Sequence, residues 1–497
     1  MITGVRTIFG IDLRTLGLFR IVLGLVIIAD LINRAQYLTF FYTDHGVMTT
    51  EEARAWLGSI RLSFHLLSGA TWFQVLLFVI AGVIAALFTI GYRTGLMTVL
   101  SWVFLLSLQN RNLIVQQAGD ILLLLLLFWS IFLPLGARFS VDAARAPPRE
   151  TPQSNAYFSA ATVAILLQAI YVYVIGALLK GSPDWITEGT AVYYALHLET
   201  YATSLGHWLR QFGSVMKALT HYVWVLELVA PLIVFSPVFH LPLRLIGQVL
   251  LITMHIGFAL FLFIGLFPAV SISSLLLFTP GAVWDWHEKR TGTIKRLGAA
   301  LAGMGARLAA VFPARARPEK IRLHPVETGF VVVMTVLVFL WNLQHLAFVP
   351  YSTPRWADTL FYALKIDQRW DMFAPRPART DGWYVIHGRL DDGSPVDLWT
   401  GTPGKPDFKK PESVYDTYGD YRVRKYFSRI WLDRYRSQLG NYARHLCRKW
   451  NEDGYGRGRE LVDFELWFVK ETSLPDYLPR HRERLRLKTW ICSAEGA

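Results

Sequence analysis

Charged residues are scarce in this chain. Asp, Glu, Lys and Arg make up 18% of its 497 residues, whereas a soluble globular domain carries about 25%. Aromatic residues make up 14%, and the mean hydropathy is +0.33. A disordered protein has the opposite composition, with little apolar content and much charge. The composition therefore excludes a disordered chain and argues against an ordinary cytosolic enzyme.

Cysteine is almost absent, with only Cys447 and Cys492 in the chain. Two thiols are too few for a disulfide scaffold or for a four-cysteine zinc or iron–sulfur site. The two residues can form a disulfide if their part of the chain lies outside the cytoplasm. The pattern alone leaves the pairing open and favours two separate buried thiols.

Long apolar runs fill the first 349 residues. About 20 apolar residues in a helix cross the hydrocarbon core of a bilayer, and nine segments approach that length, three of them short. They predict a polytopic α-helical membrane domain of about nine transmembrane helices over residues 1–349, in the cell membrane. The nine segments are 15–32, 73–91, 95–109, 119–135, 157–179, 222–240, 245–266, 268–284 and 328–349.

Basic residues gather in the loops on one side of these segments. The stretch 285–327 carries nine Lys and Arg against four acidic residues, and 136–156, Arg93 and Arg244 add further positive charge on the same side. Cytoplasmic loops are enriched in Lys and Arg. We therefore expect a cytoplasmic N-terminus and an extracytoplasmic position for everything after the ninth segment. The net charge of +13 is then largely a topology signal, and without a recognition motif it predicts no nucleic-acid partner.

Residues 350–497 are rich in charge and lack long apolar runs. A hairpin is predicted where 384–390 is followed by Asp391-Asp392-Gly393 and then 395–400. Apolar residues recur at helical spacing over 426–450, and the segments 462–468 and 484–491 alternate like strands. We expect a small extracytoplasmic α+β domain.

Several ionisable residues fall inside the predicted spans, where they are costly and suggest function. Arg20, Asp30 and Asp120 are read first as structural ion pairs between helices. Glu227 is equally compatible with structure and function. His255 lies in the middle of a span, and an interhelical hydrogen bond is the simplest interpretation of it.

Lys180 lies at the outer end of the fifth span, where a lysine often reaches out to the interface. Aromatic and polar residues follow it closely, including Trp185, Tyr194 and His197. An amine kept dry among such rings would lose its proton easily and act as a base. No metal site is expected, because His197 and Glu199 are two residues apart and face different sides of a helix. Asn110-Arg111-Asn112 is either an anion site or a polar loop.

An ordered set of fragments resembles the HTTM family, the membrane domain shared with vitamin K-dependent γ-carboxylases. The similarity extends over residues 8–400. The fragments are Tyr42-Thr43-Asp44-His45-Gly46, 107–112 before Gly119-Asp120, 128–136, Lys180-Gly181-Ser182-Pro183-Asp184-Trp185 with Gly189, His255 with 263–268, and 368–375.

The resemblance implies chemistry at the outer face of the membrane. In the carboxylases a lysine five residues before a tryptophan deprotonates reduced vitamin K, and Lys180 and Trp185 have this spacing. The quinol then reacts with O2, a peptide glutamate is carboxylated, and vitamin K leaves as its epoxide. By this analogy Lys180 is the catalytic base, reduced vitamin K or another quinol is the cofactor, and a secreted peptide or protein is the substrate. The expected pocket residues are His255, Trp185, Tyr171, Tyr194, Asn112 and Arg111.

Two other functions stay open at this point. The outer part is far smaller than that of the animal carboxylases, so the chain can instead be a non-catalytic HTTM scaffold that binds a membrane lipid or a secreted partner. A transporter is the third alternative, although such proteins usually contain inverted repeats and we detect none in the sequence.

Overall fold

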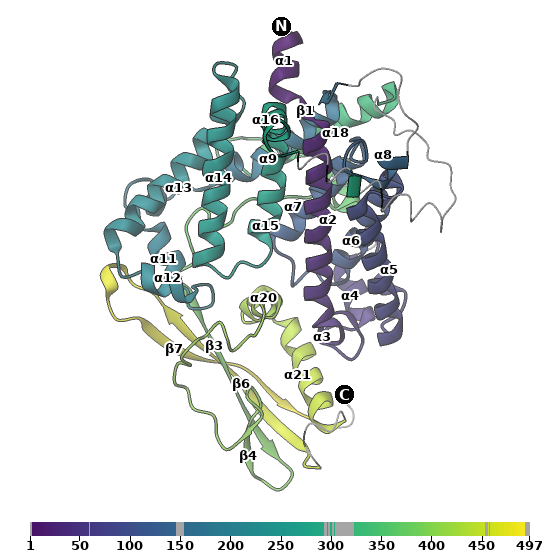
Figure 1. The fold of residues 1–497 in the computed structure, drawn as a ribbon. Helices are drawn as coiled ribbons and strands as arrows, with labels where there is room; N and C mark the ends of the chain where they lie inside the picture. Colours follow the sequence, from purple (N-terminus) through teal and green to yellow (C-terminus); the bar gives the residue numbers. More distant parts are fainter. Residues whose placement is uncertain are drawn as a thin grey trace.

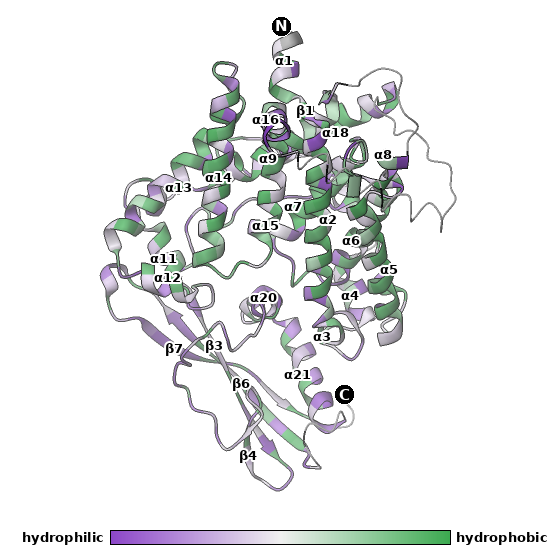
Figure 2. Ribbon diagram, viewed as in Figure 1, coloured by the Kyte–Doolittle hydropathy of each residue, from purple (hydrophilic) through white to green (hydrophobic). Residues whose placement is uncertain are grey.

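The computed structural model describes residues 2–58, 60–145, 154–292, 323–452 and 458–492, with the single positions 296, 299, 300, 303 and 456. Most of the basic stretch expected over 285–327 lies outside the described residues. Helices form the upper part of the molecule and a twisted sheet forms the lower part (Figure 1). Figure 2 shows the same division in hydropathy, with mostly hydrophobic residues along the long helices above and a mixture of hydrophilic and hydrophobic residues below.

Six of the described helices are long and apolar enough to cross a membrane. They overlap the expected apolar runs, although α13 begins nine residues before its run and α14 five residues before its run. In an apolar medium the backbone has no better partners than its own i→i−4 hydrogen bonds. The six are α2 (Leu13–Ala35), α5 (Thr71–Ile90), α9 (Ala160–Leu179), α13 (Gly213–Val234), α14 (His240–Phe261) and α18 (Pro325–Leu343).

The expected number of nine spans is not confirmed. A seventh span results only if the helical stretch Phe267–Phe278, which comprises α15 (Phe267–Leu275) and a 3-10 turn, is joined to α16 (Gly281–Thr291) across a bend of 88°. The segments expected at 95–109 and 119–135 become α6 (Thr94–Arg111) and α7 (Ala118–Ser130). At 13 residues, α7 is too short to cross a bilayer by itself.

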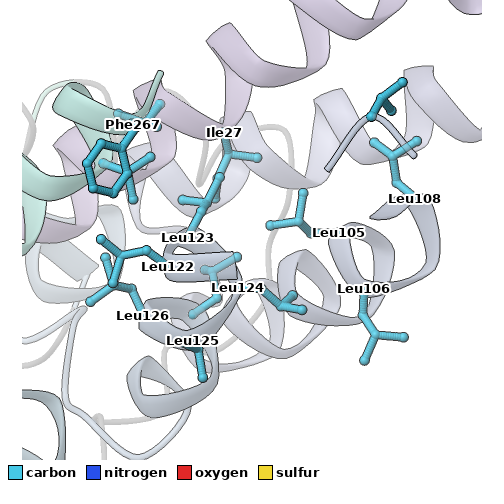
Figure 3. Close-up of a cluster of buried hydrophobic side chains, with 14 of the residues drawn as sticks. Ile27, Leu105, Leu106, Leu108, Leu122, Leu123, Leu124, Leu125, Leu126 and Phe267 are labelled. Atoms are coloured by element: carbon cyan, nitrogen blue, oxygen red, sulfur yellow. The ribbon is translucent and has the colours of Figure 1, made fainter. Parts of the chain in front are cut away.

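The helix α7 instead forms the centre of the helical part. Leu122, Leu123, Leu124, Leu125 and Leu126 are all at most 1% exposed, and α6, α9 and α15 pack around them. Figure 3 shows these leucines pointing to different sides of the helix, with Ile27, Leu105 and Phe267 nearby. A helix that is apolar on every side is one that is buried on every side, and α7 satisfies this rule inside the protein.

The lower part of the molecule is the predicted α+β unit. Its sheet has the order β5-β4-β3-β6-β7, with every neighbouring pair antiparallel. The expected hairpin and the two expected strands are present. The strands are β3 (Thr380–Leu390), β4 (Pro395–Asp397), β5 (Thr402–Pro403), β6 (Leu461–Thr472) and β7 (His481–Ile491). The domain boundary expected at 349/350 falls between α18 and α19 (Arg355–Leu364).

The single helix expected over 426–450 is wrong. The structure has α20 (Tyr421–Ile430) and α21 (Ser437–Asn451), separated by a 3-10 turn at Asp433–Tyr435. Arg422 of α20 binds Asp120 of α7, while α21 packs on β6 and β7.

Cys447 and Cys492 form a disulfide between α21 and the end of β7, with their Cα atoms 5.5 Å apart. The preference for two separate thiols is therefore wrong. The two cysteines are 45 residues apart in the sequence, so the pattern alone does not indicate that they are close. They come together only when α21 packs on the edge of the sheet.

Candidate functional site

The backbone turns sharply at Lys180. This residue caps the C-terminus of α9, and its N–H donates to Ala177 O at 3.1 Å. Gly181 and Ser182 follow, and Pro183 then opens the short helix α10 (Pro183–Ile186), where proline at the first position is already shaped for a helix. The turn brings Trp185 back over the lysine side chain.

The amine of Lys180 is buried between a carboxylate and an aromatic ring. Its Nζ donates a hydrogen bond to Glu227 Oε2 on α13 and lies 4.6 Å from the centre of the Trp185 ring. Lys180 is 6% exposed and Glu227 also 6%. The pairing offsets the cost of removing both charges from water, and the tryptophan face adds a cation–π attraction.

The segment 370–373 forms the cover of this pair. Trp185 Nε1 donates to Phe373 O at 3.0 Å. A Cβ atom added at Gly176 would lie 3.6 Å from Trp370 O and 3.9 Å from Glu227 Oε2. The segment 368–375, one of the fragments that resemble the family, therefore lies next to the Lys180–Glu227 pair. Gln368 anchors it, because its Oε1 accepts from Gln168 Nε2 at 2.8 Å and from Trp370 Nε1 at 2.9 Å.

His255 on α14 is bound to Tyr173 on α9. The Tyr173 hydroxyl and His255 Nε2 are 2.8 Å apart, and the rings of Phe258 and Phe267 surround the imidazole. Nδ1 of His255 is buried without a hydrogen-bond partner in the described part of the chain. The interhelical hydrogen bond expected for His255 is thus present, and one polar atom of the ring remains available.

Two further residues of the predicted pocket contact other side chains. Tyr171 points toward Phe339 of α18, with the ring centres 6.3 Å apart. Residues two apart on a helix face nearly opposite sides, so Tyr173, seven residues before Lys180, shares the lysine's face and Tyr171 does not. Tyr194 has the guanidinium of Arg379 4.2 Å from its ring centre.

Arg111 and Asn112 contact the chain that follows α2. Arg111 Nη2 donates to Met48 O at 2.9 Å, and Asn112 Nδ2 donates to Phe41 O at 3.3 Å. Asn112 Oδ1 also accepts from the N–H of Ile114. Both side chains hold loops in place, and their described contacts do not include Lys180.

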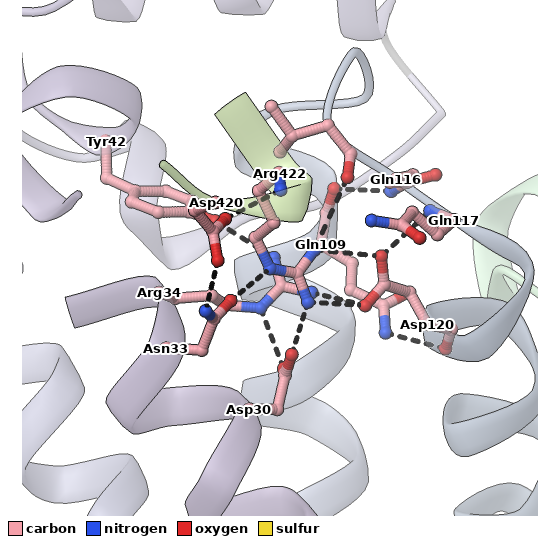
Figure 4. Close-up of polar contacts among 11 residues, drawn as sticks. Asp30, Asn33, Arg34, Tyr42, Gln109, Gln116, Gln117, Asp120, Asp420 and Arg422 are labelled. Carbon is pink, nitrogen blue, oxygen red and sulfur yellow. Dashed lines mark hydrogen bonds and ion pairs between the residues drawn. The ribbon is translucent and has the colours of Figure 1, made fainter. Parts of the chain in front are cut away.

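A second buried polar cluster contains Asp30, Arg34, Asp120 and Arg422, which we call the four-charge network (Figure 4). Arg34 donates to Asp30 Oδ2 and to Asp120 Oδ1, each at 2.7 Å. Arg422 of α20 donates to both oxygens of Asp120, at 2.8 and 3.0 Å, and to Asp30 Oδ1. All four residues are at most 5% exposed, and their charges balance.

The four-charge network confirms the ion pairs expected for Asp30 and Asp120. Arg20 instead donates to main-chain carbonyls, among them Leu135 O at 2.9 Å. Sequence reasoning missed Arg34 and Arg422. Arg34 lies four residues after Asp30 on the same helix face, a spacing that suggests a pair, whereas nothing in the sequence links Arg422 to α2.

In the described part of the chain, no three His, Cys, Asp or Glu residues are grouped so that they could hold a metal ion. No curated protein and no solved structure matches the chain. The family model described as the HTTM domain matches residues 10–286, which is more than half of the sequence. The chain, a multi-pass membrane protein, therefore belongs to the HTTM family.

Proposed function

We propose that this HTTM protein is a membrane enzyme in which Lys180 takes a proton from a reduced quinone near the outer face of the bilayer. The observation that carries the proposal is the buried pair formed by Lys180 and Glu227 beneath the ring of Trp185. An aromatic wall beside a buried amine suits a flat, weakly acidic ring. The γ-carboxylase resemblance implies the same role for a lysine at this spacing from a tryptophan.

Glu227 makes the base chemistry possible without a change in buried charge. An ammonium with a carboxylate, and an amine with a carboxylic acid, have the same net charge of zero. A proton that moves from Lys180 to Glu227 therefore leaves a neutral amine without changing the net charge that is buried. That amine can accept a proton from an acidic hydroxyl placed against Trp185. Unpaired Nδ1 of His255 is suited to a second polar oxygen of the same ligand.

The cofactor implied by this arrangement is vitamin K in its reduced form, or a related quinol. When bound, it would supply the acidic hydroxyl and the electrons that react with O2 to drive carboxylation of a peptide glutamate. Lys180, Trp185 and Glu227 would hold its ring, and the segment 370–373 would exclude water from the pair.

We also propose that the α+β domain lies outside the cytoplasm. Disulfides persist in oxidising compartments and are rare in the cytosol, so the Cys447–Cys492 bond supports an extracytoplasmic domain and a cytoplasmic N-terminus in the cell membrane.

The test is epoxide formation by the purified chain with reduced vitamin K and O2. Lys180→Met should abolish it, and Lys180→Met combined with Glu227→Gln should also be inactive while leaving no unpaired buried charge. Lys365→Met serves as the matched control, because Lys365 is equally buried but caps α19. Undiminished epoxide formation by the folded double variant would remove Lys180 from its role.

A second candidate, a non-catalytic scaffold for a secreted partner, is favoured by the sheet edge. The edge strand β7 exposes Arg482, Arg484 and Arg486 to solvent. Charges on an edge strand discourage self-association, but they also suit an acidic partner segment. Under this candidate, replacing the three arginines by glutamine abolishes partner capture, and the Lys180 variants leave it unchanged.

A further inference from the structure

A separate cavity of about 350 Å³ opens between the helical part and the turn that joins β6 to β7. One wall is aromatic, with Tyr193, His197 and Tyr477 in mutual ring contact. Arg210 and Arg480 contribute the charged side of the lining. The volume is in the range of small-molecule sites, and Lys180 is not part of the lining.

The walls of the cavity are held in a fixed shape. The hydroxyl of Tyr193 donates to Leu474 O at 2.8 Å and accepts from Tyr477 N–H at 3.1 Å. The hydroxyl of Tyr477 donates to Arg210 O at 2.8 Å. The turn after β6 is thus attached to Tyr193 and Arg210 of the helical part, so the site is formed before a ligand arrives.

The charges around the cavity do not balance. Glu199 pairs with Arg210 and Arg480 at 2.9 and 2.7 Å. Glu471 pairs with Lys410 at 2.7 Å and with Arg482 at 2.9 Å. Glu199 and Glu471 therefore share four cations, while Asp476 of the turn after β6 is exposed. Within the described chain, the side-chain hydrogen bonds of Arg210 and Arg480 run through Nη1 alone, which leaves the other guanidinium nitrogens for an anion.

Neither the nearby histidines nor Asp381 balances the surplus of cations over Glu199 and Glu471. Burial lowers the pKa of His197 to about 4, so the ring is neutral at ordinary pH. Burial raises the pKa of Asp381 to about 7, so at neutral pH this carboxyl carries only about half of a negative charge. His207 also has a lowered pKa because of burial and Arg210.

The cavity lies where a membrane helix begins. Gly213 is the first residue of α13, and a Cβ atom added there would be 3.4 Å from the Tyr477 hydroxyl. Leu478 of the lining is exposed, and so are Trp208 and Phe212, two residues before and two after Arg210. Tryptophan and other apolar side chains at the end of a span are typical of the headgroup region of a bilayer.

We propose that this cavity binds the phosphate of an anionic phospholipid headgroup, with Arg210 and Arg480 as the phosphate ligands. Guanidinium groups match phosphate with paired hydrogen bonds. The space accommodates a headgroup but not two acyl chains, which would lie along Trp208, Phe212 and Leu478. The proposal is independent of the chemistry assigned to Lys180.

The test is the binding of phosphatidylglycerol to the purified full chain, measured by native mass spectrometry against phosphatidylcholine. We expect preferential retention of phosphatidylglycerol. Arg480→Gln should weaken its binding about tenfold, in line with the loss of one charge-assisted hydrogen bond. Arg482→Gln is the matched control. Arg482, like Arg480, is a positively charged partner of Glu471, but it does not line the cavity.

A second pair of variants leaves every ion pair intact. Pro479→Glu adds a negative charge to the lining, and Pro475→Glu adds the same charge in the same exposed turn but outside the lining. Only Pro479→Glu should weaken phosphatidylglycerol binding. Equal retention of the two lipids, or equal effects within both variant pairs, would overturn the proposal. Competition by inorganic phosphate at the same affinity as the lipid would also overturn it and assign the cavity to a soluble anion.

Discussion

Replacing Arg422 with methionine tests how the outer domain is attached to the membrane helices. In the four-charge network, Arg422 donates to Asp30 and Asp120, and its Nε donates to Asn33 Oδ1 at 3.1 Å. Without this guanidinium, two buried carboxylates share the single cation of Arg34. One negative charge is then left uncompensated at a site that is at most 5% exposed.

Removing one partner of a buried ion pair typically costs about 3–5 kcal/mol, because the other charge stays buried. We expect Arg422→Met to lower the free energy of unfolding by that amount. Combining Arg422→Met with Asp120→Asn removes one charge of each sign and leaves Asp30 paired with Arg34 at 2.7 Å. The double variant should therefore be more stable than Arg422→Met alone.

The assay is guanidinium unfolding in detergent micelles, followed by tryptophan fluorescence, together with protease cleavage between α19 and β3. Arg436→Met is the matched control, because Arg436 pairs with Asp433 on the surface with both side chains exposed, and such pairs contribute little. The reasoning is refuted if Arg422→Met is as stable as Arg436→Met, or if adding Asp120→Asn lowers the stability further.

Two more predictions concern the outer domain. Burial raises the pKa of Asp381 to about 7, whereas in the unfolded chain this carboxyl loses its proton above pH ~4. The contribution of Asp381 to the stability of the fold therefore falls as the pH rises from about 4 to about 7, and it stays low at higher pH. Asp381→Asn should raise the melting temperature at pH 8 and change it little at pH 4, and an equal gain at both values would contradict this origin. Breaking the Cys447–Cys492 bond with the variant Cys492→Ser should cost about 4 kcal/mol, since the closed loop spans 45 residues. Unchanged melting of the purified Cys492→Ser protein would indicate that the bond constrains little.

Much of the architecture follows from local patterns in the chain. Apolar runs locate the long helices, and alternation over 462–468 locates β6, because both patterns depend on residues close in sequence. The spacing of Lys180 and Trp185 is also local, and a single turn brings them together. The same logic predicts a span at 119–135 that the structure does not confirm, because a run of leucines suits a protein core and a bilayer equally well.

The amino-acid sequence by itself determined a membrane protein with a charged α+β end, and it singled out Lys180, Glu227, Asp30 and Asp120 as residues that needed partners. Only the tertiary structure decided which partners they have. Arg422 reaches Asp30 across 392 positions and Asp120 across 302, and the cavity beside Arg480 exists only where the turn after β6 meets the start of α13. Ion pairs and cavities depend on distances of a few ångströms between elements, and no periodicity along the chain encodes those distances.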